Sequence, residues 1–141
     1  MGFMSVDSQY DILTSRIEEI LPKKEFMYKL EKSVKNNIPL NIKLGCDPSR
    51  PDLHIGHSVV LNKLKQFQDL GHNIILVIGD FTAMIGDPTG RNKTRPQIDL
   101  KETKENSKTY LSQVSKILNI KKTKIVYNSK WLNEINFNKL I

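Results

Sequence analysis

The sequence has few of the features that mark secreted or membrane proteins. Its one cysteine, Cys46, permits no internal disulfide, and a lone thiol is typical of a reducing compartment. No apolar run approaches the ~20 residues that a transmembrane helix needs, and no basic stretch followed by an apolar one opens the chain. Val6 stands where a myristoylation signal requires serine or threonine. These absences favour a cytoplasmic protein without a membrane partner.

Arginine is also scarce relative to lysine. The 141 residues carry a net charge of +7, but only 4 of the 22 basic side chains are arginine. A basic chain is typical of a nucleic-acid partner, whereas arginine is the residue that usually clamps phosphates and reads bases. Abundant lysine, asparagine and isoleucine are equally typical of an AT-rich genome. Charge alone therefore leaves a nucleic-acid partner open.

The spacing of apolar residues predicts an N-terminal helical segment, residues 1–39, followed by alternating strands and helices. In that segment two helices are expected, over residues 7–21 with Asp7 as cap, and over residues 24–36. Strands are then expected over residues 40–45, 74–78 and 123–128. Helices are expected over residues 54–70, over residues 99–118 with Asp99 and Glu102 as a capping box, and over residues 130–141.

The same spacing predicts which faces are buried. The helix over residues 54–70 should bury Val60, Leu61, Leu64 and Phe67. Five consecutive apolar residues, 74–78, are typical of a strand that is covered on both faces. Strand, helix and strand in this order predict right-handed crossovers and a parallel sheet. The fold class expected is α/β, an open Rossmann-like parallel sheet with flanking helices.

Two histidines, His54 and His57, stand at the start of the helix expected over residues 54–70. As neighbours on a helix they could share a metal ion, but a catalytic zinc usually needs a third protein ligand. The spacing of Cys46 and His72 recommends neither as that ligand. They could also be ordinary surface residues. A metal site and a surface role both stay open on this motif alone.

A phosphate site is the third reading of the pair. A loop with two prolines leads from the first expected strand to His54, and ligands bind at this edge of open α/β sheets. The unpaired N–H groups of a helix N-terminus attract phosphate. Gly56 leaves room for a ligand close to the backbone, and neutral imidazoles can donate hydrogen bonds to phosphate oxygens.

Further stretches carry a resemblance to a known family. "KLGCDPSRPDLHIGH", "QFQDLGH" and "MIGDPTGRNKTR", within residues 43–95, together closely resemble bacterial tyrosyl-tRNA synthetases, which are class I enzymes. The resemblance runs from about Leu40 to Trp131. Other adenylyl or cytidylyl transferases share only the H-x-G-H pattern. The related tryptophanyl enzymes usually have asparagine for the second histidine and lack this form of "IGDPTG".

The resemblance implies the reaction and the residues that serve it. L-tyrosine would be activated with ATP, supplied with Mg²⁺, and passed to tRNA(Tyr) by a homodimeric enzyme that holds no metal of its own. It implies catalytic His54 and His57, and ATP contacts from Pro48, Ser49, His54, Gly56 and His57. It implies tyrosine or adenylate contacts from Lys43, Gly45, Asp47, Thr82, Asp87 and Asn128.

Some of these assignments have plainer alternatives. Asp87 would bind the substrate's amino group, or be an Asp-Pro turn residue, and Asn128 would face the amino acid or cap a strand end. Lys43 stands where many relatives have the tyrosine that recognises the phenol hydroxyl of the substrate. The residue that recognises this hydroxyl here is therefore unassigned. By the same resemblance, we expect these 141 residues to lack the family's later lysine-rich loop and its anticodon-binding domain. Residues 40–141 are thus expected to be the first half of a catalytic domain, and the chain alone a poor activator of tyrosine or a non-catalytic piece.

Overall fold

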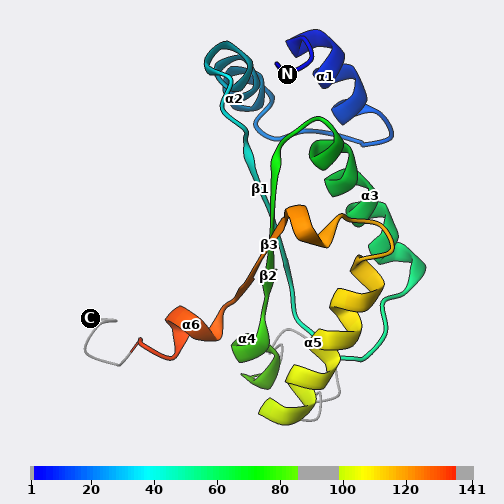
Figure 1. The fold of residues 1–141 in the computed structure, drawn as a ribbon, viewed down its shortest axis with the longest axis vertical. Coiled ribbons are helices and arrows are strands. Elements are labelled where there is room, and N and C mark those ends of the chain that lie inside the picture. The colour runs from blue at the N-terminus through cyan, green and yellow to red at the C-terminus, as the bar shows by residue number, and fades with distance from the viewer. Residues whose placement is uncertain (1, 86–98, 136–141) are drawn as a thin grey trace.

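The three expected strands pair in parallel. In the computed structural model, which describes residues 2–85 and 99–135, they are β1 (Asn41–Cys46), β2 (Asn73–Ile78) and β3 (Thr123–Tyr127). Within these residues they form one sheet in the order β1-β2-β3. The three strands run through the centre of the view in Figure 1. The register places Cys46 opposite Ile78, and Ile78 opposite Tyr127. The prediction of an open parallel α/β sheet with flanking helices is confirmed, and all three strands end at one edge.

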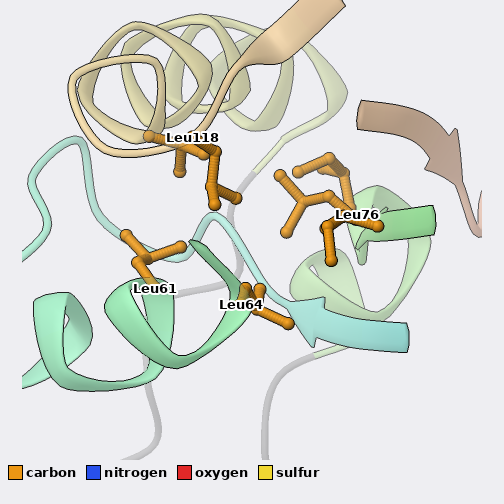
Figure 2. Packing of buried hydrophobic residues seen from close by; sticks show 7 residues of the cluster. Leu61, Leu64, Leu76 and Leu118 are labelled. Atoms are coloured by element: carbon orange, nitrogen blue, oxygen red, sulfur yellow. The ribbon is translucent and has the colours of Figure 1, made fainter. Parts of the chain in front are cut away.

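The two crossover helices cover the same face of the sheet. Helix α3 (Ile55–Asp69) joins β1 to β2, and α5 (Leu100–Val114) precedes β3. Figure 2 shows Leu61 and Leu64 of α3 facing two other core side chains, Leu76 of β2 and Leu118, which follows α5. The whole buried cluster is Leu61, Leu64, Ile74, Leu76, Ile78, Val114 and Leu118. Each of these side chains gains roughly 1.5–3 kcal/mol on leaving water, which fastens both helices to β2.

Two burial predictions are wrong for this part of the chain. Along β2 the burial alternates, because Ile75 and Val77 point to the face that the described helices leave uncovered. The strand is therefore buried on one face, not both. Val60 is 45% exposed although Leu61, beside it, is buried. The apolar stripe of α3 is thus narrower than its sequence indicates.

The first expected helix is also too long. Helix α1 spans Val6–Thr14, with Ser5 rather than Asp7 as its cap, whereas α2 (Lys23–Asn36) agrees with the prediction. The Nζ of Lys63, on α3, donates to the carbonyl oxygens of Leu13 (3.0 Å) and Ser15 (2.9 Å). These contacts satisfy carbonyls that the end of a helix leaves unpaired. A cation from another helix therefore stabilises an end that local apolar spacing does not indicate.

The remaining elements are short or end earlier than expected. Asp99 caps α5 by accepting from the backbone N–H of Glu102 (2.7 Å), as predicted, but the helix ends at Val114. Helix α4 (Asp80–Ile85) and the 3₁₀ turn Ile120–Lys122 were not expected. Of the last predicted helix, α6 covers Ser129–Leu132, and residues 136–141 lie outside the description. None of the helices in the described ranges is long and apolar enough to cross a membrane.

A buried histidine ties α1 to the sheet. His72, 4% exposed, accepts the backbone N–H of Leu40 at Nδ1 (3.2 Å), so its ring hydrogen sits on Nε2. That Nε2–H donates to Oε1 of Gln9 (2.9 Å), and the Gln9 amide donates to the carbonyl of Met4 (2.9 Å). Burial lowers the pKa of His72. The neutral ring is thus the form that the folded chain holds.

This arrangement predicts a pH-dependent loss of stability. Below about pH 6.5 His72 is protonated in the unfolded chain but not in the folded chain. The free energy of unfolding should therefore fall as the pH falls, by at most about 1.4 kcal/mol per pH unit. The fall should end where the pH reaches the lowered pKa of His72 in the folded state. Denaturant unfolding between pH 7.5 and 5 measures it. His72→Gln should be less stable at pH 7.5 and lack this component. An identical decline in both proteins contradicts the assignment.

Candidate active site

The candidate site lies where the three strands end. Asp47 follows β1, Gly79 follows β2, and Asn128 follows β3. Residues 47–53 then lead to His54, the N-cap of α3. In open parallel sheets this carboxyl edge is where ligands bind. Most of the side chains predicted for a site are therefore brought to one edge.

The histidine pair closes the start of α3 with its own rings. Nδ1 of His54 accepts the backbone N–H of Gly56 (3.2 Å), and Nδ1 of His57 accepts the backbone N–H of His54 (3.2 Å). The ring centroids are 4.0 Å apart. Because both Nδ1 atoms are acceptors, the hydrogen of each neutral ring sits on Nε2. The pair thus offers two N–H donors at a helix N-terminus, which suits an anion.

Gly56 has a steric reason of its own. A Cβ at this position would lie 3.0 Å from both Cε1 and Nδ1 of His54. Such a contact is tighter than nearly all real Cβ contacts, so a side chain here would push the capping ring of His54 by a few tenths of an ångström. The glycine therefore protects the orientation of His54 as well as leaving space for a ligand.

A cavity of about 380 Å³ adjoins the pair. It brings together five predicted site residues, namely Gly45, Asp47, His54, Gly56 and His57. Its apolar walls include Leu44, Leu61, Leu76 and Val114, so the site rests directly on the core. Five predicted residues of the described ranges do not line it. Lys43 lies exposed on β1, Pro48 is fully buried, and Ser49 is part of the loop that follows. Thr82, on α4, and Asn128, directly after β3, also lie outside the lining.

A chain of hydrogen bonds connects the three strand ends. The amide Nδ2 of Asn128 donates to Oγ1 of Thr82 (2.9 Å), and that hydroxyl donates to Oδ1 of Asp47 (2.8 Å). The Oδ1 of Asn128 accepts the backbone N–H of Phe81 (2.9 Å). Asn128 occupies the N-cap position of α6 without a side-chain capping bond. Its side chain bonds Phe81 and Thr82, which follow β2, so a role facing the amino acid and a role as a strand-end cap both stay predictions.

Asp87 lies outside the described residues, as does the rest of residues 86–98. Its place relative to the histidines therefore stays a prediction. The assignment of Asp87 to a substrate ammonium rests on the sequence resemblance alone. The site described here is built from β1, β2, β3 and the residues that follow each of them.

The sequence did not reveal how the loop before His54 is held. Three polar side chains of α5 fasten its backbone. Asn106 donates to the carbonyl of Pro48 (3.1 Å), Thr109 donates to that of Pro51 (2.7 Å), and Gln113 donates to Pro51 (3.0 Å) while accepting from the N–H of Leu53 (2.9 Å). Their spacing along α5 is the one available signal, and a solvent-facing polar stripe has the same spacing.

Cys46 does not act as a thiolate here. Burial, and secondarily the charge of Asp47, raise the pKa of Cys46 to about 11, so the thiol stays protonated at neutral pH. Thiolate is the form that binds zinc. Among the described residues, no three histidine, cysteine, aspartate or glutamate side chains gather in a way that could hold a metal ion. The histidine pair therefore has no partner of that kind in this part of the chain.

Fold and site together define an open α/β protein in which the N-terminus of α3, which attracts anions, lies beside the carboxylate of Asp47. The family model described as tRNA synthetases class I (W and Y) matches residues 35–141. The chain belongs to this family. Its fold also resembles the tyrosyl-tRNA synthetase of Archaeoglobus fulgidus, solved with L-tyrosine, with a TM-score of 0.75 and 17% identity over 97% of this chain and 38% of that one.

Curated relatives are closer in sequence. The tyrosine–tRNA ligase of Chlorobaculum tepidum is 58% identical over 137 residues, which is 97% of this chain and 34% of that protein. The tyrosine–tRNA ligase of Salinibacter ruber is 54% identical over 141 residues, 100% of this chain and 34% of its own length. The chain thus spans about a third of these relatives.

Gly79 offers a direct test of the site's packing. A Cβ on Gly79 would lie 1.8 Å from Oδ1 of Asp47 and 2.5 Å from Oγ1 of Thr82. Gly79→Ala should therefore break the Asp47–Thr82 hydrogen bond and lower the free energy of unfolding by about 1–3 kcal/mol. Gly45→Ala is the matched control, since its Cβ would meet only Nζ of Lys43, at 3.7 Å. Equal unfolding midpoints for the two variants in urea contradict this packing.

Proposed function

We propose that this chain forms the ATP-facing and tyrosine-facing part of a tyrosine–tRNA ligase. In its complete form that enzyme activates L-tyrosine with ATP and transfers it to tRNA(Tyr). The histidine pair carries the proposal, because both rings keep Nδ1 on the backbone and line the cavity that Asp47 also lines. The family and the curated relatives supply the substrate class.

In the proposed first step, a tyrosine carboxylate oxygen attacks the α-phosphorus of ATP. The new P–O bond forms as the bond to the β-phosphate bridging oxygen breaks, and pyrophosphate leaves with the Mg²⁺ that accompanies ATP as substrate. His54 and His57 donate Nε2–H bonds to the phosphate oxygens. These bonds strengthen as charge shifts during the displacement, which is the condition for raising the rate rather than only the affinity.

The loop before the pair completes the proposed ATP side. Gly56 leaves the start of α3 open to the nucleotide. Buried Pro48 and half-buried Ser49 shape the near wall, with the Ser49 hydroxyl on the side of the γ-phosphate. The position of the loop supports this assignment of Pro48 and Ser49, because the loop joins β1 to His54 and α5 holds its backbone in place.

The amino acid and the adenylate sugar belong on the other side of the cavity. Asp47 lines the cavity and is linked by hydrogen bonds to Thr82 and, through Thr82, to Asn128, which supports their joint assignment. We assign Gly45 to the sugar and substrate backbone, Asp87 to the tyrosine ammonium, and Lys43 to the wall near the substrate. In the second step a ribose hydroxyl of the tRNA 3′ end attacks the tyrosyl carbonyl, and AMP leaves.

The cellular setting follows from the same proposal. We propose a cytoplasmic enzyme that works as a homodimer and takes tRNA(Tyr) as its macromolecular partner. Residues 40–141 would be the first half of its catalytic domain, and residues 1–39 a helical segment beside it. Lysine dominates the net charge of +7, and a basic chain suits a tRNA partner.

Two substitutions at each histidine separate catalysis from capping. In the complete enzyme, His54→Asn keeps an acceptor near the Nδ1 position and loses the distal donor, whereas His54→Gln places an N–H near the Nε2 position. We expect the asparagine variant to lower kcat by about 10²–10³-fold with little change in the KM for tyrosine. The glutamine variant should recover part of the loss. Corresponding variants of His57 should behave alike.

Tyrosine-dependent ATP–pyrophosphate exchange provides these rates, and thermal unfolding shows that each variant is folded. A kcat near wild type for the asparagine variants would contradict the proposed role of the pair. So would a loss that appears wholly in the KM for tyrosine, because the histidines are assigned to the phosphates.

A further inference from the structure

Asp80 is a buried carboxylate that the proposed chemistry does not use. It is 5% exposed and is the first residue of α4, directly after Gly79. Its Oδ1 accepts the backbone N–H of Ser129 (2.9 Å) and of Phe81 (3.1 Å). Its Oδ2 accepts the hydroxyl of Ser129 (2.6 Å). The carboxylate therefore joins the end of β2 to the start of α6, which follows β3.

The bonds of Asp80 adjoin those of Asn128. Asn128 directly precedes Ser129, and its Oδ1 shares the N–H of Phe81 with Oδ1 of Asp80. A backbone N–H can only donate, so the oxygen of the Asn128 amide must face Phe81. The amide nitrogen then faces Thr82, where it donates to Oγ1.

The orientation of the Asn128 amide determines which group the Thr82 hydroxyl donates to. Oγ1 of Thr82 already accepts from Asn128, so the hydroxyl uses its one hydrogen as a donor. The nearer acceptor is Oδ1 of Asp47, at 2.8 Å, and the carbonyl of Gly79 is 3.3 Å away. Oδ1 of Asp47 thus accepts from Thr82, while the same carboxylate lines the cavity, where it can also accept from a ligand donor.

We infer that Asp80 is a positioning residue for the amino-acid side of the site. By holding Ser129, it fixes the Asn128 amide, which directs the Thr82 hydroxyl to Asp47 and so orients the carboxylate that meets the substrate. The inference rests on the proposed function. It separates two sides of the site, because the loop and histidines that face ATP are held by α3 and α5 instead.

The test uses the complete enzyme and compares three variants in ATP–pyrophosphate exchange. Asp80→Asn keeps the shape and loses the charge and one acceptor. Asn128→Asp cannot donate to Thr82, so the hydroxyl turns away from Asp47. The third is the double variant. Each single change should raise the KM for tyrosine by about tenfold, with the KM for ATP unchanged. Because both act through one chain, the double variant should show little further increase.

Glu105→Gln, on the exposed side of α5, is the matched loss of one carboxylate and should leave both constants unchanged. Multiplication of the two single effects in the double variant overturns the inference. An equal rise in both KM values also overturns it, as does a normal KM for tyrosine in Asp80→Asn. If Asp80→Asn does not fold, Ser129→Ala takes its place in the same cycle, with a smaller rise expected and the same outcomes decisive.

The wild-type enzyme separates this inference from the proposed function. Absence of tyrosine-dependent exchange in the wild type would defeat the proposed function itself. Normal exchange in the wild type, together with independent effects of Asp80 and Asn128, would leave the proposed function standing and defeat only the positioning role of Asp80.

Discussion

The close approach of Asp47 to Gly79 is the constraint around which the site is arranged. Parallel pairing places Cys46 opposite Ile78, and the N–H of Gly79 donates to the carbonyl of Cys46 (2.9 Å), so the residues after the two strands must meet. No Cβ fits between them. With a glycine there, the carboxylate reaches Thr82 and, through it, the end of β3. The register of the strands therefore determines how the polar side chains at the strand ends are arranged.

The histidine loop is fixed by a different set of contacts. Pro48 and Pro51 lie in the loop between β1 and α3, outside any helix or strand, so their carbonyls need donors from elsewhere. Asn106 and Gln113 of α5 supply donors, and the apolar side of α5 packs on β2 through Val114. One helix therefore joins the core to the loop that presents the imidazoles. The core and the site cannot shift independently, because the cavity walls are core side chains.

Local patterns predicted the features that local interactions determine. The N-cap of α3 at His54, the cap at Asp99 and the parallel pairing of the strands all follow from short stretches of sequence. The end of α1 does not, because Lys63 stabilises it from 48 residues away. The bonds of Asp80 to Ser129 likewise cross 49 residues. Such contacts depend on tertiary packing, and a single sequence without geometry carries no sign of them.

All three histidines make the same kind of hydrogen bond to the backbone, but the bond serves different purposes. Each Nδ1 accepts a backbone N–H, from Gly56, from His54 and from Leu40 respectively, so each neutral ring carries its hydrogen on Nε2. At His72 that hydrogen meets Gln9 in a buried contact and holds α1 in place. At the start of α3 the rings line a cavity instead. The tautomer is set by the backbone in every case. Burial therefore decides whether the same donor serves the fold or is available to a ligand.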